Sequence, residues 1–421
     1  MQKTVIENNV LGEKVIKAVH ESGLNILVCE KKDFSSSFAI FGTKYGSIDT
    51  RFQKDGQSPI TVPEGIAHFL EHKLFENEDC DAFVRFAKTG ANANAYTSFD
   101  RTCYLFSCSD KFKDNLDILL DFVRSPYFTA ETVKKEQGII GQEIKMYDDV
   151  PDWCVFFNLI KSLYKNHPVK INIAGTVESI SEITDELLYS CYNTFYNMSN
   201  MFLCIAGNVD ADEILKTVQN TIPSSKPDGF TRLDFDETEN IVTSYTEQKM
   251  AVSMPLFAFG IKLSPKENPT MRDILINEIA LDVLVGSSST LYRDLINEGF
   301  INKTFETEYF WGRGYSALLF QGQSKNPEKT AELIKSEIEA LRNGIDKELF
   351  EVIKKDTLGK CITDWDNPED IVSNLVDCVF VDGNPFAELE ALEKITIDDI
   401  ISCFKNINLE LSALSVINPL E

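Results

Sequence analysis

Two histidines four residues apart constrain this chain more than any other feature of its sequence. His68 and His72 are two of only four histidines in 421 residues, and Glu71 stands between them in the order His-x-x-Glu-His. Histidines at i and i+4 share one side of a helix, and neutral imidazole is a common ligand of Zn²⁺. Chance occurrence of this pattern in a chain of this length is roughly 1%. The motif therefore predicts a helical metal site.

The residues before the motif predict where this helix begins. Thr61 and Glu64 have the spacing of a capping box, and Pro63 suits a first helical turn, so we expect the helix to start at about Pro63. At 100° per residue the helix has a motif face and an opposite apolar face. The motif face carries His68, Glu71, His72 and Phe75, and the apolar face carries Ile66, Leu70 and Leu74.

A third ligand has to come from elsewhere, because a catalytic zinc site has three protein ligands and one open position. His20 and His167 stand alone in the sequence, and we expect structural or surface roles for both. In the helix expected over residues 129–147, Glu136 and Glu143 lie on one stripe. We predict Glu143 as the third ligand and Glu136 as a residue that supports a ligand. The alternative is that both are solvated carboxylates on the helix surface.

The charge of the chain excludes several classes of partner. Lys and Arg number 41 against 66 Asp and Glu, which gives 41 − 66 = −25. Such a surface repels phosphate backbones and anionic lipid, so we expect neither nucleic acid nor a membrane as partner. The N-terminus has no long apolar run, and the ten cysteines form no CxxC pairs. We therefore expect a cytoplasmic protein whose cysteines are reduced core residues.

Strand patterns mixed with helical runs predict an α+β fold. We expect strands at 24–29, 36–45, 102–108, 202–207 and 411–416, and helices at 80–89, 114–124, 129–147, 153–164 and 184–195. A polar, irregular stretch separates two parts of similar length. The predicted organisation is an N-terminal zinc-binding domain at 1–222, a linker at 223–249 and a C-terminal domain at 250–421.

Short internal similarities indicate that the second part repeats the first. Lys134-Lys-Glu-Gln-Gly-Ile-Ile140 is similar to Lys354-Lys-Asp-Thr-Leu-Gly-Lys360, and Leu188-Tyr-Ser-Cys-Tyr192 is similar to Ile400-Ile-Ser-Cys-Phe404. A duplicated domain of about two hundred residues is the simplest account, although matches this short can also arise by chance. The second copy has no histidine where the motif helix is expected, at 279–285. We predict two homologous α/β-sandwich domains with one metal site per chain.

The chain resembles the inverzincin peptidases, which include pitrilysin, insulin-degrading enzyme and the mitochondrial processing peptidase. The resemblance lies in His68-Phe-Leu-Glu-His72, in Glu136 and Glu143, in Gly90-Ala-Asn-Ala-Asn-Ala-Tyr-Thr97 and in the duplicated layout. It implies a zinc endopeptidase in which Zn²⁺ is bound by His68, His72 and Glu143 and Glu71 is the general base. The edge strand that takes the substrate is then Asn94, Ala95, Tyr96 and Thr97; without a metal beside it, an ordinary strand start is the alternative.

The resemblance also implies a partner. The chain has the length of one half of a four-domain clamshell, as in bacterial processing-peptidase-like catalytic subunits. In the family, an arginine and a tyrosine from a facing domain contact the substrate, whereas the corresponding positions here hold Ile296 and Asn302. Tyr292, Arg293, Arg313 and Tyr315 lie close by with different spacing. We therefore expect a heterodimer with a homologous, non-identical subunit that supplies the Arg and Tyr.

Two rival hypotheses remain. One is a catalytically silent peptide-binding subunit, which the intact motif argues against. The other is an interaction protein with structural zinc, but structural sites are usually closed by four ligands, often cysteines.

Overall fold

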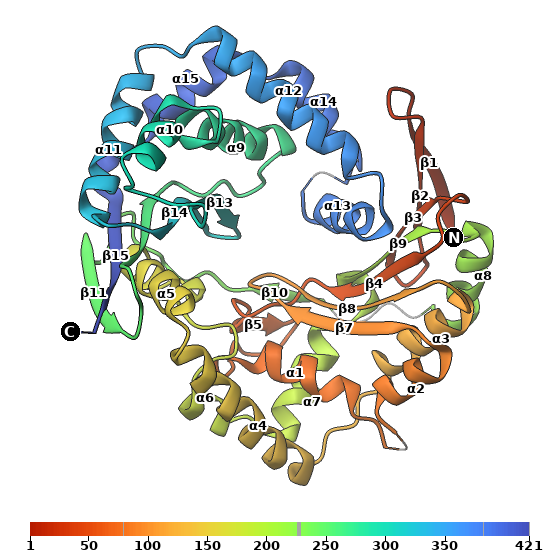
Figure 1. The fold of residues 1–421 in the computed structure, drawn as a ribbon. Coiled ribbons are helices and arrows are strands. Elements are labelled where there is room, and N and C mark those ends of the chain that lie inside the picture. The colour runs from red at the N-terminus through yellow and green to blue at the C-terminus, as the bar shows by residue number, and fades with distance from the viewer. Residues whose placement is uncertain (79, 225–228, 382, 421) are drawn as a thin grey trace. The chain divides into compact units, whose positions relative to one another are not determined.

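The computed structural model describes residues 1–78, 80–224, 229–381 and 383–420 (Figure 1). The chain forms two compact units, and each combines a sheet with helices. Unit 1 contains Met1–Ile144, Asn172–Asp234 and Ile362–Phe386. Unit 2 contains Lys145–Ile171, Phe235–Cys361 and Ala387–Glu421. The predicted fold class, two α+β sandwiches, is confirmed.

A seven-stranded mixed sheet forms the centre of unit 1, with the order β1-β2-β3-β9-β4-β8-β7. Only β3 and β9 run parallel among its neighbouring strands. A small second sheet has the order β10-β5-β6. The strands are β1 (Gln2–Asn8), β2 (Glu13–Val19), β3 (Asn25–Glu30), β4 (Ser37–Thr43), β5 (Arg51–Lys54), β6 (Ile60–Thr61), β7 (Asn92–Thr97), β8 (Thr102–Cys108), β9 (Met201–Gly207) and β10 (Phe230–Arg232).

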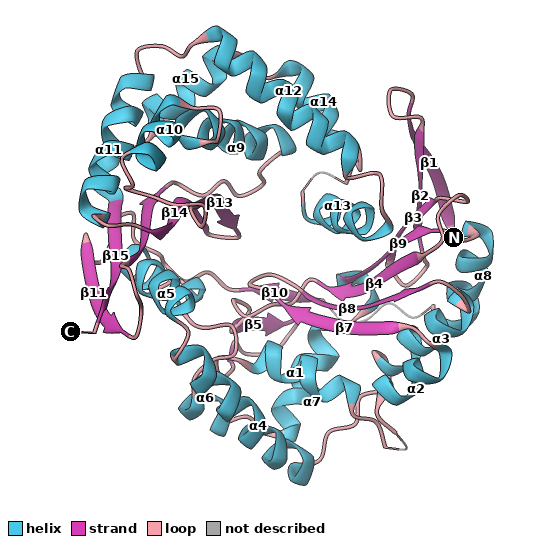
Figure 2. Cartoon of the chain, viewed as in Figure 1, coloured by secondary structure: helices cyan, strands magenta, loops and turns pink. Residues whose placement is uncertain are grey.

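Helices cover both faces of this sheet, and Figure 2 shows α13 on one of them. Helices α1, α2, α3 and α8 pack on the other face, and α7 packs on α1. Strand β4 is buried along its whole length: Ala39 and Phe41 face the larger core, and Phe38 and Ile40 face α13. The helices are α1 (Ile66–Phe75), α2 (Ala82–Thr89), α3 (Phe112–Phe122), α4 (Ala130–Asp148), α6 (Val177–Ser181), α7 (Asp185–Phe195), α8 (Ala211–Thr221) and α13 (Pro368–Phe380), with the 3-10 turn η2 (Met198–Asn200).

Unit 2 has a five-stranded sheet with the order β11-β15-β12-β14-β13. Helix α5 packs on one face, and α9 and α11 pack on the other. The strands are β11 (Tyr245–Met250), β12 (Leu256–Lys262), β13 (Glu306–Gly312), β14 (Tyr315–Gln323) and β15 (Ser412–Pro419). The helices are α5 (Pro151–Leu163), α9 (Met271–Val285), α10 (Thr290–Asn297), α11 (Pro327–Leu341), α12 (Lys347–Thr363), α14 (Ala387–Lys394) and α15 (Ile397–Asn406), with η1 (Pro168–Lys170) and η3 (Leu409–Leu411).

Five strands of the first sheet and the five strands of the second are arranged in the same way. In unit 1 the strands β3-β9-β4-β8-β7 include one parallel pair, β3 with β9, and in unit 2 the strands β11-β15-β12-β14-β13 include the parallel pair β11 with β15. In each unit a single long helix covers one face, α13 in unit 1 and α5 in unit 2. The internal similarity in the sequence therefore reflects two copies of one architecture.

The units differ from the contiguous halves expected from the sequence. Residues 145–171, with α5, belong to unit 2, and residues 362–386, with α13, belong to unit 1. The stretch 223–249, expected as an irregular linker, contributes strand β10 to a sheet of unit 1 and strand β11 to the sheet of unit 2. Its residues 225–228 lie outside the described part of the chain. Polar composition hid these strands, because both lie at sheet edges.

No single helix among the described residues combines the length and the apolar composition needed to cross a membrane. Helices α9 and α10 meet both criteria only when taken together, across a bend of 45°.

Candidate metal centre

Helix α1 carries the motif, and a glycine fixes where it begins. The helix starts at Ile66, directly after Gly65, whose φ of 85° is in the left-handed region. A Cβ atom on Gly65 would lie 2.3 Å from the carbonyl oxygen of Ala174, so only glycine permits this approach of two loops. The predicted capping box of Thr61 and Glu64 is wrong, because Thr61 ends strand β6 and no side chain caps the helix.

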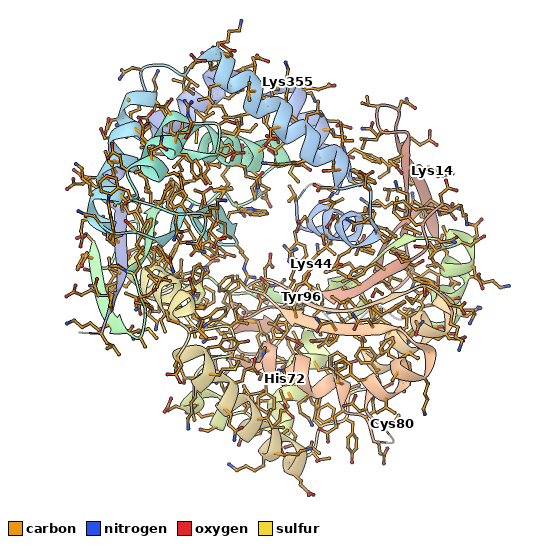
Figure 3. All side chains as sticks on the ribbon, viewed as in Figure 1. Lys14, Lys44, His72, Cys80, Tyr96 and Lys355 are labelled. Carbon is orange, nitrogen blue, oxygen red and sulfur yellow. The ribbon has the colours of Figure 1, made fainter. Side chains whose placement is uncertain are left out.

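Burial of one side orients α1. Ile66, Leu70 and Leu74 are at most 2% exposed and belong to the larger core of unit 1, as their spacing predicted. Phe75, which the spacing placed with the histidines, is instead a core residue stacked on Phe83, with ring centroids 4.3 Å apart. The remaining face presents the histidines, and Figure 3 labels His72 there.

The structure brings the three predicted ligands together. The Nε2 atom of His68 lies 3.7 Å from Glu143 Oε1, and that of His72 lies 3.5 Å from Glu143 Oε2. One ligand atom from each residue lies within 4.8 Å of the others, and no second group of this kind is found among the described residues. Ligand atoms 2.0–2.1 Å from a tetrahedral zinc ion are about 3.4 Å apart. The spacing and the donor types therefore fit Zn²⁺.

Burial and neighbouring charges shift the pKa values of the two rings in opposite directions, and only the shift of His68 favours the neutral form that binds a metal ion. Burial, together with the neighbouring His72, lowers the pKa of His68 to about 3, so its ring is neutral. Burial also opposes the charge on His72, but its hydrogen bond with Glu136 and the charges of Glu71 and Glu143 outweigh burial and raise the pKa. Deprotonated Nε2 atoms are the form that a metal ion takes up.

Glu136, predicted to support a ligand, contacts one of the two motif histidines. Its Oε1 atom lies 3.0 Å from Nδ1 of His72. A carboxylate at this distance holds the proton on Nδ1 and leaves Nε2 for the metal. His68 differs, since no hydrogen-bond partner for its buried Nδ1 atom is found among the described residues. The carboxylate of Glu136 thus helps to orient the His72 ring.

Glu71 is buried beside this group. It is 9% exposed, and its Oε2 atom accepts a hydrogen bond of 2.6 Å from the Thr97 hydroxyl. Burial raises the pKa of Glu71, and the Thr97 hydrogen bond offsets part of the rise. A desolvated carboxylate with a raised pKa is suited to accepting and returning a proton. The link between Thr97 and Glu71 has no signal in the sequence, because it depends on how a strand end meets a helix.

Strand β7 ends next to Glu71 and has a free edge. It is the last strand of its sheet, and β8 is its one partner among the described strands. Ala93, Ala95 and Thr97 point to the helical face, and Asn94 and Tyr96 alternate with them. Figure 3 labels Tyr96 on this strand. The predicted substrate edge, Asn94 to Thr97, is therefore the outer edge of a strand that leads to the candidate metal site.

Two histidines and one carboxylate form a donor set found in catalytic zinc sites of metallopeptidases. Residues 62–177 match the family "Insulinase (Peptidase family M16)", and residues 182–356 match "Peptidase M16 inactive domain". The chain belongs to peptidase family M16, a family of zinc proteases. The candidate metal ligands lie within the first of these two matched segments, which agrees with a metal site in the first copy.

Relatives cover the chain from end to end. The uncharacterised zinc protease YmfH of Bacillus subtilis is 42% identical over 405 residues, which is 94% of each chain. The crystal structure of an M16-like peptidase from Alicyclobacillus acidocaldarius has a TM-score of 0.93 and 34% identity, covering 99% of this chain and 100% of that one. Pitrilysin shares the fold at 16% identity with a TM-score of 0.78, and this chain covers 46% of it.

Proposed function

We propose that this chain is the catalytic subunit of a zinc-dependent endopeptidase that cleaves peptides or unfolded polypeptide segments. The observation that supports this proposal most directly is the convergence of His68, His72 and Glu143 beside the buried Glu71. A bound zinc ion supplies Lewis acidity, which acidifies water and polarises a peptide carbonyl. His68, His72 and Glu143 hold the ion.

The other residues of the site move protons and position the substrate. Glu71 accepts a proton from the attacking water and donates it to the leaving amine. Thr97 holds one oxygen of Glu71 through its 2.6 Å hydrogen bond and leaves the other oxygen for the reaction. The free edge of β7, at Asn94 to Thr97, binds the substrate main chain as an added strand, so an extended conformation matters more than individual side chains.

The subunit pairs with a homologous, non-identical chain that contributes an arginine and a tyrosine to the substrate carbonyl, and cleavage takes place in the closed chamber between them. Local structure in unit 2 supports this part of the proposal. Asn302 donates a 2.7 Å hydrogen bond to Gln323, and Arg293 donates to the Ser289 carbonyl and the Thr290 hydroxyl of its own helix start. These side chains have structural partners already.

The function is tested with Glu71→Gln in the assembled enzyme. The substitution removes the base and no ligand, so hydrolysis of an unfolded peptide should be lost while about one zinc per chain is retained. Glu131→Gln, on the exposed first turn of α4, is the matched control and should change neither. If the wild-type complex carries zinc and binds peptides without cleaving them, the chain is the silent peptide-binding subunit instead.

The partner is tested by assaying the purified chain alone against unfolded peptides. Loss of one oxyanion donor typically costs about 10²- to 10³-fold in rate, so the chain alone should be at least that much slower than the complex. Full turnover by the chain alone, abolished by Arg293→Gln or Tyr292→Phe, would instead show that this chain provides its own donors.

A further inference from the structure

Unit 2 contains a cavity of about 440 Å³ that the peptidase function does not use. Its volume is within the roughly 300–1,000 Å³ of small-molecule sites. It lies between α9, α15 and the end of β12. Its walls combine apolar side chains, Leu263, Ile276, Ile407 and Leu411, with polar ones, among them Asn277, Tyr309, Ser402 and Cys403.

The duplicated architecture shows what occupies the same place in unit 1. Strands β9 and β15 each begin directly after a 3-10 turn, so Met201 corresponds to Ser412. Their partners in the neighbouring strand are Thr43 and Ile261. Thr43 and Ile261 are each followed by a lysine, Lys44 or Lys262. Lys44 lies over the ring of Phe380 at the end of α13, and Lys262 lies over the ring of Tyr164 at the end of α5. Tyr45 of unit 1 therefore corresponds to Leu263 of unit 2.

Helix α15, which lines the cavity in unit 2, corresponds to helix α7 of unit 1. The N-cap residues Thr184 of α7 and Thr396 of α15 are each followed seven residues later by a cysteine, Cys191 or Cys403. Four residues further on, unit 1 has Phe195, whereas unit 2 has Ile407.

An aromatic ring fills this place in unit 1. Tyr45 is fully buried and stacks on Phe195, with ring centroids 4.0 Å apart. Burial raises the pKa of Tyr45, and the neighbouring Cys191 thiol raises it further. Phe52 of strand β5 packs edge-on against the same Phe195 ring, with ring centroids 4.8 Å apart. In unit 2 the segment between strand and helix has only residues 263–270, and the equivalent space is a cavity.

The polar side chains of the cavity indicate which polar groups a ligand would carry. Deep in it, the Cys403 thiol lies 3.5 Å from Oδ1 of Asn277, which is the place of the Cys191 thiol in unit 1. Two ion pairs with partly exposed side chains also line the cavity. Arg272 lies 2.8 Å from Asp399, and Lys266 lies 2.5 Å from Asp273. Each pair offers both signs of charge. A ligand with one ammonium and one carboxylate can bind both without leaving an unpaired charge.

From this geometry we infer that the cavity of unit 2 is a binding site for a free aromatic amino acid. The ring takes the place that Tyr45 has in unit 1, against Leu263 and Ile407, and a phenol hydroxyl reaches Cys403 and Asn277. The carboxylate binds Arg272 or Lys266, and the ammonium group binds Asp399 or Asp273. All residues that line the site belong to unit 2, and the inference is independent of the metal centre.

Isothermal titration of the full chain with L-tyrosine and related probes tests the chemistry. L-Tyrosine should bind, and L-phenylalanine should bind about three- to tenfold more weakly, because one hydrogen bond is lost. Tyramine and 3-(4-hydroxyphenyl)propionate each lack one charge and should bind at least about tenfold more weakly than L-tyrosine. Absence of L-tyrosine binding at millimolar concentration, or equal binding of L-leucine, would overturn the inference.

Substitutions test the location. Leu263→Tyr restores the side chain found at the equivalent position of unit 1 and should abolish binding while leaving the melting temperature unchanged or higher. Arg272→Gln should weaken L-tyrosine more than tyramine, because tyramine has no carboxylate. Lys355→Ala removes an exposed cation on α12, outside the cavity, and should change nothing (Figure 3). Unchanged L-tyrosine affinity in both Leu263→Tyr and Arg272→Gln would place any binding elsewhere and refute the site.

Discussion

At the scale of single residues, the two glutamates of α4 have different tasks that metal analysis can separate. One carboxylate oxygen of Glu143 lies 3.7 Å from Nε2 of His68 and the other lies 3.5 Å from Nε2 of His72, whereas Glu136 lies 3.0 Å from Nδ1 of His72. The first position fits the predicted ligand, and the second fits the predicted residue that supports a ligand. Removal of the supporting carboxylate typically costs 10- to 100-fold in metal affinity or activity, because the ring orientation is lost.

We therefore expect Glu143→Gln to lower zinc affinity more than Glu136→Gln does. The measurement is a competition titration of the purified variants against a zinc chelator, with Glu131→Gln of the same helix as control. Affinity losses in the reverse order would mean that the third ligand is not Glu143. Circular dichroism of both variants excludes a general loss of helix as the cause.

At the scale of elements, strand β7 makes a prediction about substrate backbone. Strand β7, Asn92 to Thr97, pairs with β8 along one edge, and none of the described strands pairs with the other. Main-chain groups on that edge can therefore pair with a peptide, apart from the Ala95 N–H, which donates a hydrogen bond to Oδ1 of Asn94. Proline or an N-methylated residue in the substrate removes one main-chain donor from such a pairing. We expect at least about a tenfold loss of kcat/KM, equivalent to one to two hydrogen bonds, when the change lies within the paired stretch.

The control for this experiment is the same modification more than six residues from the cleaved bond. Each modification should be placed at successive positions, because alternate residues of a strand point their N–H groups to opposite edges. The losses should then alternate along the peptide. Uniform rates at all positions would contradict binding as an added strand.

Elements with strong patterns could be predicted from the sequence, and elements that depend on their neighbours could not. The apolar runs of β4, β8 and β9 and the helix with Glu136 and Glu143 lie where they were expected, because burial on both faces or a long regular period leaves a clear signal. The hairpin of β1 and β2 and the edge strand β11 carry many polar residues, and no pattern marks them. The start of α1 was misjudged because Gly65 is required by a contact with Ala174, more than a hundred residues away.

At the scale of the whole molecule, two helices are exchanged between the halves of the sequence. Helix α13 comes from the second half and covers the sheet of unit 1, where it packs on β4 and β9. Helix α5 comes from the first half and covers the sheet of unit 2, where it packs on β12 and β15. Each unit therefore depends for one face of its core on residues from the other half of the sequence.

The size of this dependence can be estimated from the side chains of α13. Ile371, Val372, Leu375 and Val376 are at most 1% exposed and pack with Ile40 of β4 and other residues of the same core. At about 1.5–3 kcal/mol for each buried aliphatic side chain, these four contribute roughly 6–12 kcal/mol. The total stability of a domain is about 5–15 kcal/mol. Loss of α13 should therefore leave unit 1 without a stable fold.

We expect residues 1–234, expressed alone, to lack a cooperative unfolding transition and to bind a hydrophobic dye, although they contain every residue of the candidate metal site. The measurement is calorimetric unfolding of the fragment, compared with the fragment co-expressed with residues 235–421. Co-expression supplies α13 and should restore a cooperative transition and zinc binding. A cooperative transition and zinc uptake by 1–234 alone would show that the larger core on the helical face of the sheet is sufficient, and that α13 is an addition to a fold already stable without it.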